Sequence, residues 1–161
     1  MFNVGDFIIY GNSGVCKVMG VGPLDEGDDR EYYTLKPVYI RDSTILTPVD
    51  NDRVVMREVM TREEAKDFIS GIKDIGTLDV IDERKIDHDY KRALLTCDPS
   101  EIVKTIKTIY IRTEERQAEG KKATASDSKY CHIAEDNLYG ELAISLDMDK
   151  EEVREYIHLN V

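Results

Sequence analysis

The basic residues of this 161-residue chain are concentrated in one segment. Residues 84–129 contain eleven Lys and Arg against eight Asp and Glu, whereas the whole chain has 22 basic and 33 acidic residues. The segment therefore has a charge of +3 in a chain of net charge −11. Lysine and arginine side chains in such a segment can contact DNA phosphates. On composition alone, basic residues that merely cover exposed helix faces are the more common explanation.

The side chains that we predict to reach phosphates occur in two places. One group lies just before and on a short predicted helix, and the other lies in and after a turn between two long predicted helices. In chain order they are Arg84, Lys85, Lys91, Arg92, Lys121, Lys122 and Lys129. Because the rest of the chain is acidic, the sequence predicts weak, steeply salt-sensitive DNA binding unless another protein positions the domain.

Motifs for catalysis or metal binding are absent from the sequence. There is no G-x-x-x-x-G-K-[ST], G-x-S-x-G or H-E-x-x-H. Cys16, Cys97 and Cys131 lie far apart, and the histidines are isolated from one another, at positions 88, 132 and 158. We therefore predict buried or half-buried thiols, histidines on helix surfaces, and no catalytic site, metal or cofactor.

The composition is that of a globular chain, with 41% hydrophobic and 34% charged residues. No apolar run approaches the roughly 20 residues that a membrane span needs. The first residues, Met1 to Asp6, lack the basic start and apolar stretch of a signal peptide. We expect a cytoplasmic protein without a membrane partner.

Residues 1–58 predict an all-β domain. Short β-rich runs at 7–10, 15–21, 31–35, 43–47 and 53–56 are separated by turns. Residues Gly11 to Gly14 tolerate positive φ and predict a tight hairpin between the first two strands. Five strands in so short a segment indicate a small barrel or a strongly bent sheet.

Residues 59–161 predict an all-α domain of about five helices. A capping box at Thr61 to Glu64 begins the first helix, and a short helix follows at 87–95. Asp98 and Pro99 begin a long helix that we expect to end near Glu119. Ser126 or Asp127 is expected to begin the next helix, and Asp149 the last. The fold class is therefore α+β, with the two kinds of structure in separate domains.

Several segments resemble the CarD/CdnL family of bacterial transcription regulators. In the β half they are residues 2–10, 14–15, 32–37 and above all 43–51, S-T-I-L-T-P-V-D-N. In the helical half they are residues 94–99 and 139–143. The N-terminal pattern is shared with the polymerase-binding module of transcription-repair coupling factors, and the helical half favours CarD.

The resemblance implies a Tudor-like or SH3-like β domain that docks on the β subunit of RNA polymerase. It also implies a helical domain that reaches promoter DNA at the upstream edge of the bubble. An exposed strand can extend a partner's sheet by main-chain hydrogen bonds. Carried over by position, the polymerase-binding residues are Pro23, Leu24, Ile45, Leu46 and Thr47. The alternative is that Ile45 is core, while Leu46 and Thr47 are ordinary edge-strand surface.

One position departs from the family pattern. Members often carry a tryptophan before the first basic helix, where it acts as a wedge at the fork of the melted DNA, but this chain has no Trp. Val80 or Ile81 lies at about that position. An aliphatic side chain can still press on unstacked bases, although with a smaller contact. The departure bears directly on whether open promoter complexes are stabilised.

The leading hypothesis is a non-enzymatic transcription regulator that binds polymerase through its β domain and promoter DNA, weakly, through its helical domain. The alternative is an adaptor that binds polymerase and never contacts DNA. Exposed edge strands also pair between copies, so the sequence is compatible with a monomer or a weak dimer.

Overall fold

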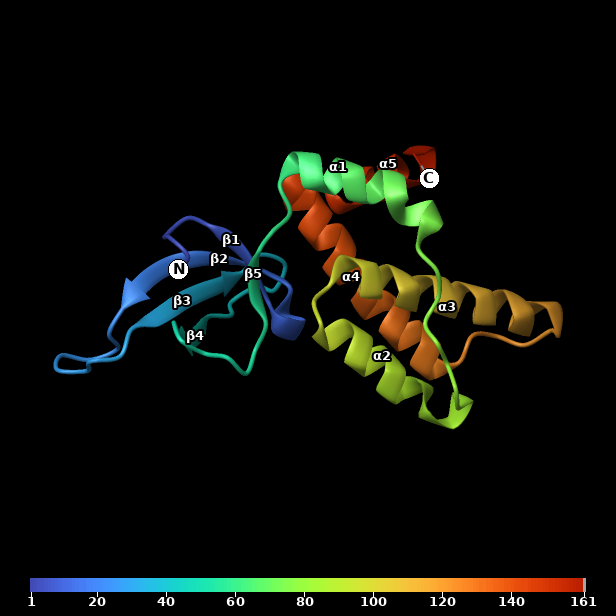
Figure 1. The fold of residues 1–161 in the computed structure, drawn as a ribbon, viewed down its shortest axis with the longest axis horizontal. Helices are drawn as coiled ribbons and strands as arrows, with labels where there is room; N and C mark the ends of the chain where they lie inside the picture. The colour runs from blue at the N-terminus through green and yellow to red at the C-terminus, as the bar shows by residue number, and fades with distance from the viewer. Residues whose placement is uncertain (161) are drawn as a thin grey trace.

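A computed structural model describes residues 1–160 and separates the strands from the helices in space as well as in sequence (Figure 1). The five strands are β1 (Phe7–Tyr10), β2 (Val15–Gly22), β3 (Tyr32–Pro37), β4 (Ile45–Pro48) and β5 (Met56–Glu58). The five α-helices are α1 (Arg62–Gly71), α2 (Ile86–Leu95), α3 (Pro99–Ala118), α4 (Ala125–Leu146) and α5 (Lys150–Asn160). The predicted fold class is confirmed, and we call the two parts the β domain (β1 to β5) and the helical domain (α1 to α5).

The strands form one antiparallel sheet in the order β4-β3-β2-β1-β5. Alternate side chains of β1, β2 and β3 point to one face and form the β-domain core of Ile8, Cys16, Val18, Tyr33 and Leu35. Strands β4 and β5 are the two ends of this ladder. β4 therefore has a neighbouring strand on one side only within the described chain.

The predicted hairpin between the first two strands is confirmed: β1 and β2 pair antiparallel, Gly11 and Gly14 have positive φ, and the turn between the strands is the 3₁₀ turn η1 (Gly11–Ser13). One detail of the β domain differs from the sequence prediction. The last strand lies at Met56–Glu58, three residues later than the β-branched run predicts. Pairing decides this shift, because Met56, Arg57 and Glu58 are the residues in register with β1.

Local signals place most helix starts correctly. The amide of Glu64 donates to Thr61 Oγ1 (3.2 Å) and the amide of Thr61 donates to Glu64 Oε2 (2.8 Å), which confirms the capping box of α1. Asp98 caps α3 and Asp149 accepts from the first turn of α5. The prediction for α4 is wrong by two or three residues, because Thr124 is its N-cap and not Ser126 or Asp127.

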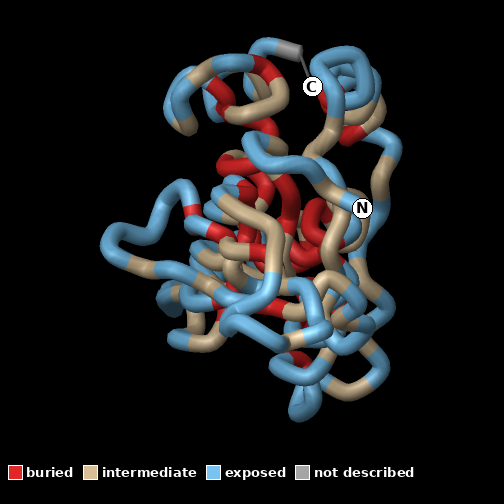
Figure 2. Tube along the Cα trace, turned by 90° about the vertical axis from the view of Figure 1, so that its left-hand side faces the viewer, coloured by how far each residue is buried: buried red, intermediate tan, exposed pale blue. Residues whose placement is uncertain are grey.

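Helix α4 is the centre of the helical domain and packs against α3, α2 and α5. Its inward residues Tyr130, Ala134, Leu138 and Leu142 are buried, as the spacing of four predicts. Figure 2 shows the buried residues gathered toward the middle of the molecule and the exposed residues around them. Between residues 1 and 160, none of the helices combines the length and apolarity needed to span a bilayer.

Candidate functional site

The β4 edge has the features of an exposed pairing strand. Leu46 is in register with Thr34 of β3 on one side, and its side chain is 54% exposed. Ile45 is half-buried and packs against the β-domain core, in keeping with the core alternative. Thr47 is only 1% exposed, and its Oγ1 accepts a hydrogen bond from Asn51 Nδ2 at 2.9 Å. The expectation that Thr47 presents its side chain at the surface is therefore wrong, and it can contribute there through its main chain alone.

The loop after β2 lies at the same end of the sheet. Gly22 pairs with Tyr32, and Tyr32 pairs with Pro48, so the start of this loop and the end of β4 belong to one row across the sheet. Pro23 and Leu24 directly follow Gly22, and both are exposed. We call the exposed residues Pro23, Leu24 and Leu46, with the open edge of β4, the edge patch.

The helical domain leaves the edge patch uncovered. It contacts the β domain through β5, η1, the start of β2 and the loop after β3, which lie elsewhere on the sheet. Figure 1 shows β4 on the side of the sheet away from α4. A partner can therefore reach the patch without any rearrangement of the helices.

At the far end of the helical domain, the segment between α1 and α2 exposes a single apolar side chain. Ile81 is 98% exposed, whereas Val80 packs against the helical core. The segment is anchored on both sides: the Leu78 amide donates to Thr108 Oγ1 of α3 (2.9 Å), and Asp82 caps the 3₁₀ turn η3 (Glu83–Lys85). Of the two predicted wedge positions, only Ile81 is presented to solvent.

Four of the predicted basic residues lie at this same far end. Arg84 and Lys85 directly follow Ile81 on η3, and Lys121 and Lys122 occupy the turn between α3 and α4 (Figure 1). All four are exposed. Arg84 pairs with Asp82 (3.2 Å) and Lys121 with Glu119 (3.3 Å), while Lys85 and Lys122 have no ion pair among the described residues. We call Ile81 and these four basic residues the basic tip.

The remaining predicted basic residues lie outside the basic tip. Lys91 and Lys129 border a groove between α2 and α4, whose other lining residues are Asn12, Leu94, Leu95, Tyr130 and Ile133. Arg92 borders a different groove, together with the carboxylates of Asp79, Asp89 and Glu101. The structure thus divides the predicted basic set among three surfaces instead of bringing it together on one face.

A buried carboxylate on α4 joins α2 and α3 beside the basic tip. Asp127 of α4 is fully buried, and it accepts hydrogen bonds from Tyr90 Oη of α2 (2.8 Å) and Arg112 Nε of α3 (3.1 Å). Arg112 also pairs with Glu83 of η3 at 3.2 Å. Burial and the hydrogen bond to Asp127 raise the pKa of Tyr90, so the tyrosine remains a neutral donor. The sequence had suggested Asp127 only as a helix start.

The cysteines and histidines lie where the sequence predicts. Cys16 and Cys97 are buried and Cys131 is half-buried, all as free thiols. The three histidines lie exposed on helices, at positions 88, 132 and 158. No group of three or more potential metal ligands occurs within residues 1–160.

In a comparison with known protein families, residues 2–60 match the family described as the CarD-like/TRCF RID domain. The matched region contains all five strands and ends just before α1. No curated protein matches the chain.

Proposed function

Because the β domain belongs to the CarD-like/TRCF family of RNA polymerase-interacting domains, we propose that the edge patch is where this chain binds RNA polymerase, on the β subunit. The family gives the chain a polymerase-binding role in transcription. The observation that supports the patch is an unpaired strand edge with a half-exposed Leu46, uncovered by the chain's own helices. The division that we propose is residues 1–58 for polymerase binding and 59–161 for promoter DNA.

The chemistry of the edge patch suits addition of a strand from a partner. The outer main-chain N–H and C=O groups of β4 have no neighbouring strand in the described chain, and a partner strand would pair with them. Leu46 lies in the middle of that strand, and because it is 54% exposed, burying the rest of its side chain would contribute about 1 kcal/mol. A charge at this position would have to be desolvated on binding.

The basic tip suits a weak contact with promoter DNA near the melted region. Ile81 offers an apolar group to unstacked bases, and Lys85 and Lys122 offer unpaired cations to phosphates. The tip biases promoter opening only if it binds the open and closed complexes with different affinity. Since Asp82 and Glu119 partly neutralise the tip, we expect measurable DNA contact only in the presence of polymerase.

Two charge-introducing variants of the full chain test the proposal. Leu46→Glu should abolish capture of RNA polymerase, whereas Ile111→Glu, a similarly exposed leucine-sized position on α3, should leave capture unchanged. The double change Lys121→Glu with Lys122→Glu should retain capture and weaken the effect on promoter opening. Its matched control is Lys66→Glu with Lys73→Glu, two exposed lysines near α1. Capture by the Leu46 variant at the level of the control would refute the edge patch.

A second candidate function is an adaptor that binds polymerase without touching DNA. The net charge of −11 and the carboxylates beside the tip favour it. The two functions differ in the salt dependence of promoter affinity with polymerase present. If the Lys121/Lys122 double variant changes neither that salt dependence nor promoter opening, the adaptor is the better description.

A further inference from the structure

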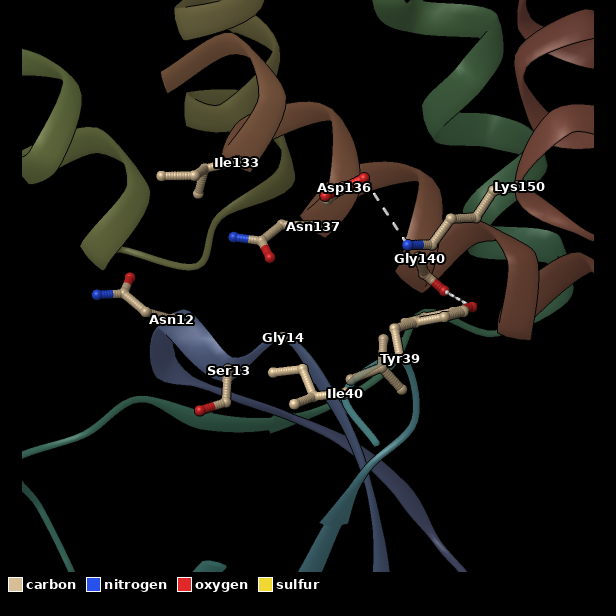
Figure 3. Close-up of a pocket in the computed structure, with 11 residues that line it drawn as sticks. Asn12, Ser13, Gly14, Tyr39, Ile40, Ile133, Asp136, Asn137, Gly140 and Lys150 are labelled. Atoms are coloured by element: carbon tan, nitrogen blue, oxygen red, sulfur yellow. Dashed lines mark hydrogen bonds and ion pairs between the residues drawn. The ribbon is translucent and has the colours of Figure 1, made fainter. Parts of the chain in front are cut away.

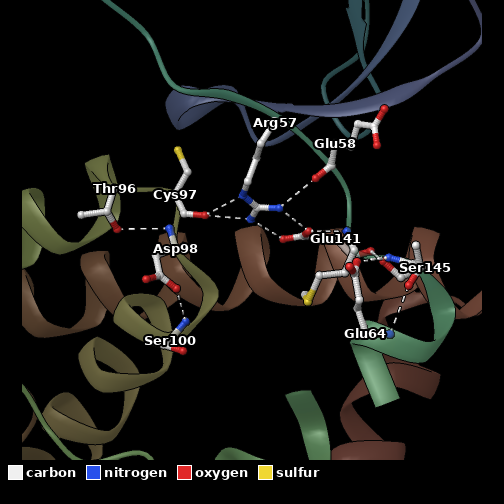
Figure 4. A network of polar contacts seen from close by, with 11 residues as sticks. Arg57, Glu58, Glu64, Thr96, Cys97, Asp98, Ser100, Glu141 and Ser145 are labelled. Atoms are coloured by element: carbon white, nitrogen blue, oxygen red, sulfur yellow. Dashed lines mark hydrogen bonds and ion pairs between the residues drawn. The ribbon is translucent and has the colours of Figure 1, made fainter. Parts of the chain in front are cut away.

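The two domains meet at a seam whose centre is Arg57 of β5 (Figure 4). Its guanidinium binds Glu141 of α4 in a two-pronged pair, with Nη1 2.6 Å from Oε2 and Nη2 2.7 Å from Oε1. Nε and Nη2 also donate to the carbonyl of Cys97 (3.0 and 2.7 Å), and Nη1 donates to the carbonyl of Glu58 (3.1 Å). An arginine has five N–H donors, so every one of them is used here.

Glu141 is bound as completely as its partner. Its side chain is 2% exposed, and Oε2 accepts a second hydrogen bond, from the Met60 amide in the segment that joins the domains (2.9 Å). Burial alone would lower the pKa of Arg57, but the hydrogen bonds and charge of Glu141 raise it above its usual value. A buried ion pair is favourable only with such geometry, so the pair holds β5, the joining segment and α4 in one arrangement.

Cys97 ties the turn between α2 and α3 to the same seam. Its φ of 55° lies in the left-handed region, which a residue with a side chain rarely adopts. Its carbonyl accepts from Arg57, and its side chain is buried with Ile9 and Val15 of the β domain. A strained backbone of this kind persists where several surrounding contacts fix it.

A second contact joins the β domain to α4 at the neighbouring residue, Gly140 (Figure 3). Tyr39, in the loop after β3, donates its hydroxyl to the carbonyl of Gly140 (2.9 Å), and Lys150 Nζ lies 3.9 Å from the centre of its ring. A Cβ atom on residue 140 would lie 2.8 Å from Tyr39 Cε2. Glycine at this position therefore allows the ring to lie against the helix backbone.

We propose that Arg57 and Glu141 are positioning residues that make the two domains one rigid body, so that docking at the edge patch fixes where Ile81 points. The inference rests on the proposed function. A flexible linker would supply only a raised local concentration of the helical domain, whereas a rigid connection also supplies its orientation. The Arg57 network, the Cys97 cluster and the Tyr39 contact join different elements and together resist both bending and rotation.

The relative orientation of the domains can be measured in solution by residual dipolar couplings. In the wild-type chain, couplings from the β domain and the helical domain should fit a single alignment tensor. In Arg57→Ala, which leaves the edge patch and the basic tip intact, they should require two. The same variant should capture RNA polymerase within about twofold of wild type, because the patch is remote from Arg57. Its effect on promoter opening should fall about tenfold or more, since the tip is no longer aimed.

The possible results test the rigid body, the positioning role of Arg57 and the proposed function separately. Two tensors for the wild type would overturn the rigid body without any variant. If the couplings of Arg57→Ala require two tensors but its effect on promoter opening is undiminished, the positioning role is overturned. If Arg57→Ala does not fold, Glu141→Gln serves in its place, because it keeps the size of the side chain and removes the charge that pairs with Arg57. Failure of wild-type polymerase capture would instead refute the proposed function, and the tensor measurement would still decide rigidity.

Discussion

Replacing Gly140 with alanine should destabilise the wild-type chain but stabilise a chain that also carries Tyr39→Ala. In an ordinary helix interior, Gly→Ala stabilises by about 1 kcal/mol. Here the new methyl group would lie 2.8 Å from Tyr39 Cε2, closer than carbon atoms approach, and 3.3 Å from Cδ2, a tight contact. Because Tyr39 is half-exposed on a loop, its ring can swing away while the helix stays intact.

The displaced ring loses two interactions whose sizes can be estimated. The hydrogen bond from Tyr39 Oη to the Gly140 carbonyl contributes about 1 kcal/mol. The contact between the ring and Lys150 Nζ contributes about 0.5–1 kcal/mol at an exposed site. Against the gain in helix propensity, Gly140→Ala should therefore destabilise the wild-type chain by roughly 0.5–1 kcal/mol. In a Tyr39→Ala background the same change should stabilise by about 1 kcal/mol.

Urea denaturation of the four chains measures this cycle, with helical circular dichroism as the signal. The expected coupling energy between positions 39 and 140 is about 1.5–2 kcal/mol. A stabilising Gly140→Ala in both backgrounds would show that Tyr39 does not rest on α4 in solution. The two domains would then be joined by the Arg57 pair and the Cys97 cluster, without the Tyr39 contact.

Three further perturbations test the structure beyond the seam. Asp127→Ala removes a buried partner of Arg112 and Tyr90 and should cost about 3–5 kcal/mol in the free energy of unfolding, measured in urea. Asp98→Ala removes the cap of α3 and should cost about 1 kcal/mol, whereas Asp98→Asn should cost less, by the same assay. Burial raises the pKa of Cys16 to about 11 from 9.0, so the folded state favours the neutral thiol. The free energy of unfolding should therefore be unaffected by this thiol below pH 9 and should fall as pH rises from 9 to 11, with a loss of about 1 kcal/mol at pH 10. The fall should be smaller in Cys16→Ala.

The features predicted correctly from sequence are those determined by neighbouring residues. Thr61 and Glu64 are three positions apart, and Asp98 acts on the amide of Ser100, so each cap can be identified within one turn. The exposed wedge position is less local. Val80 and Ile81 are adjacent and alike in chemistry, and only the packing of the segment against the helical core distinguishes the buried one from the exposed one.

The seam could not be predicted because its partners are distant in sequence. Arg57 and Glu141 are separated by 84 positions, and Tyr39 and Gly140 by 101. In sequence, Arg57 looks like a charged residue near a strand end and Glu141 like one of many helix carboxylates. Gly140 gives the one local signal, because a glycine within a helical pattern often marks close packing against another element.

If the seam orients the tip, the acidic net charge of the chain has a use, because it keeps free copies away from DNA. A strongly basic regulator would be distributed over the whole chromosome, since phosphates attract cations irrespective of sequence. This chain has a net charge of −11, and two of the four cations at its tip are paired with carboxylates, so free copies should avoid DNA. On the proposed function, DNA contact would depend on the concentration and direction that polymerase binding supplies. A small tip at the end of a rigid body would need little intrinsic affinity, because the binding energy of the proposed edge patch would already have placed it.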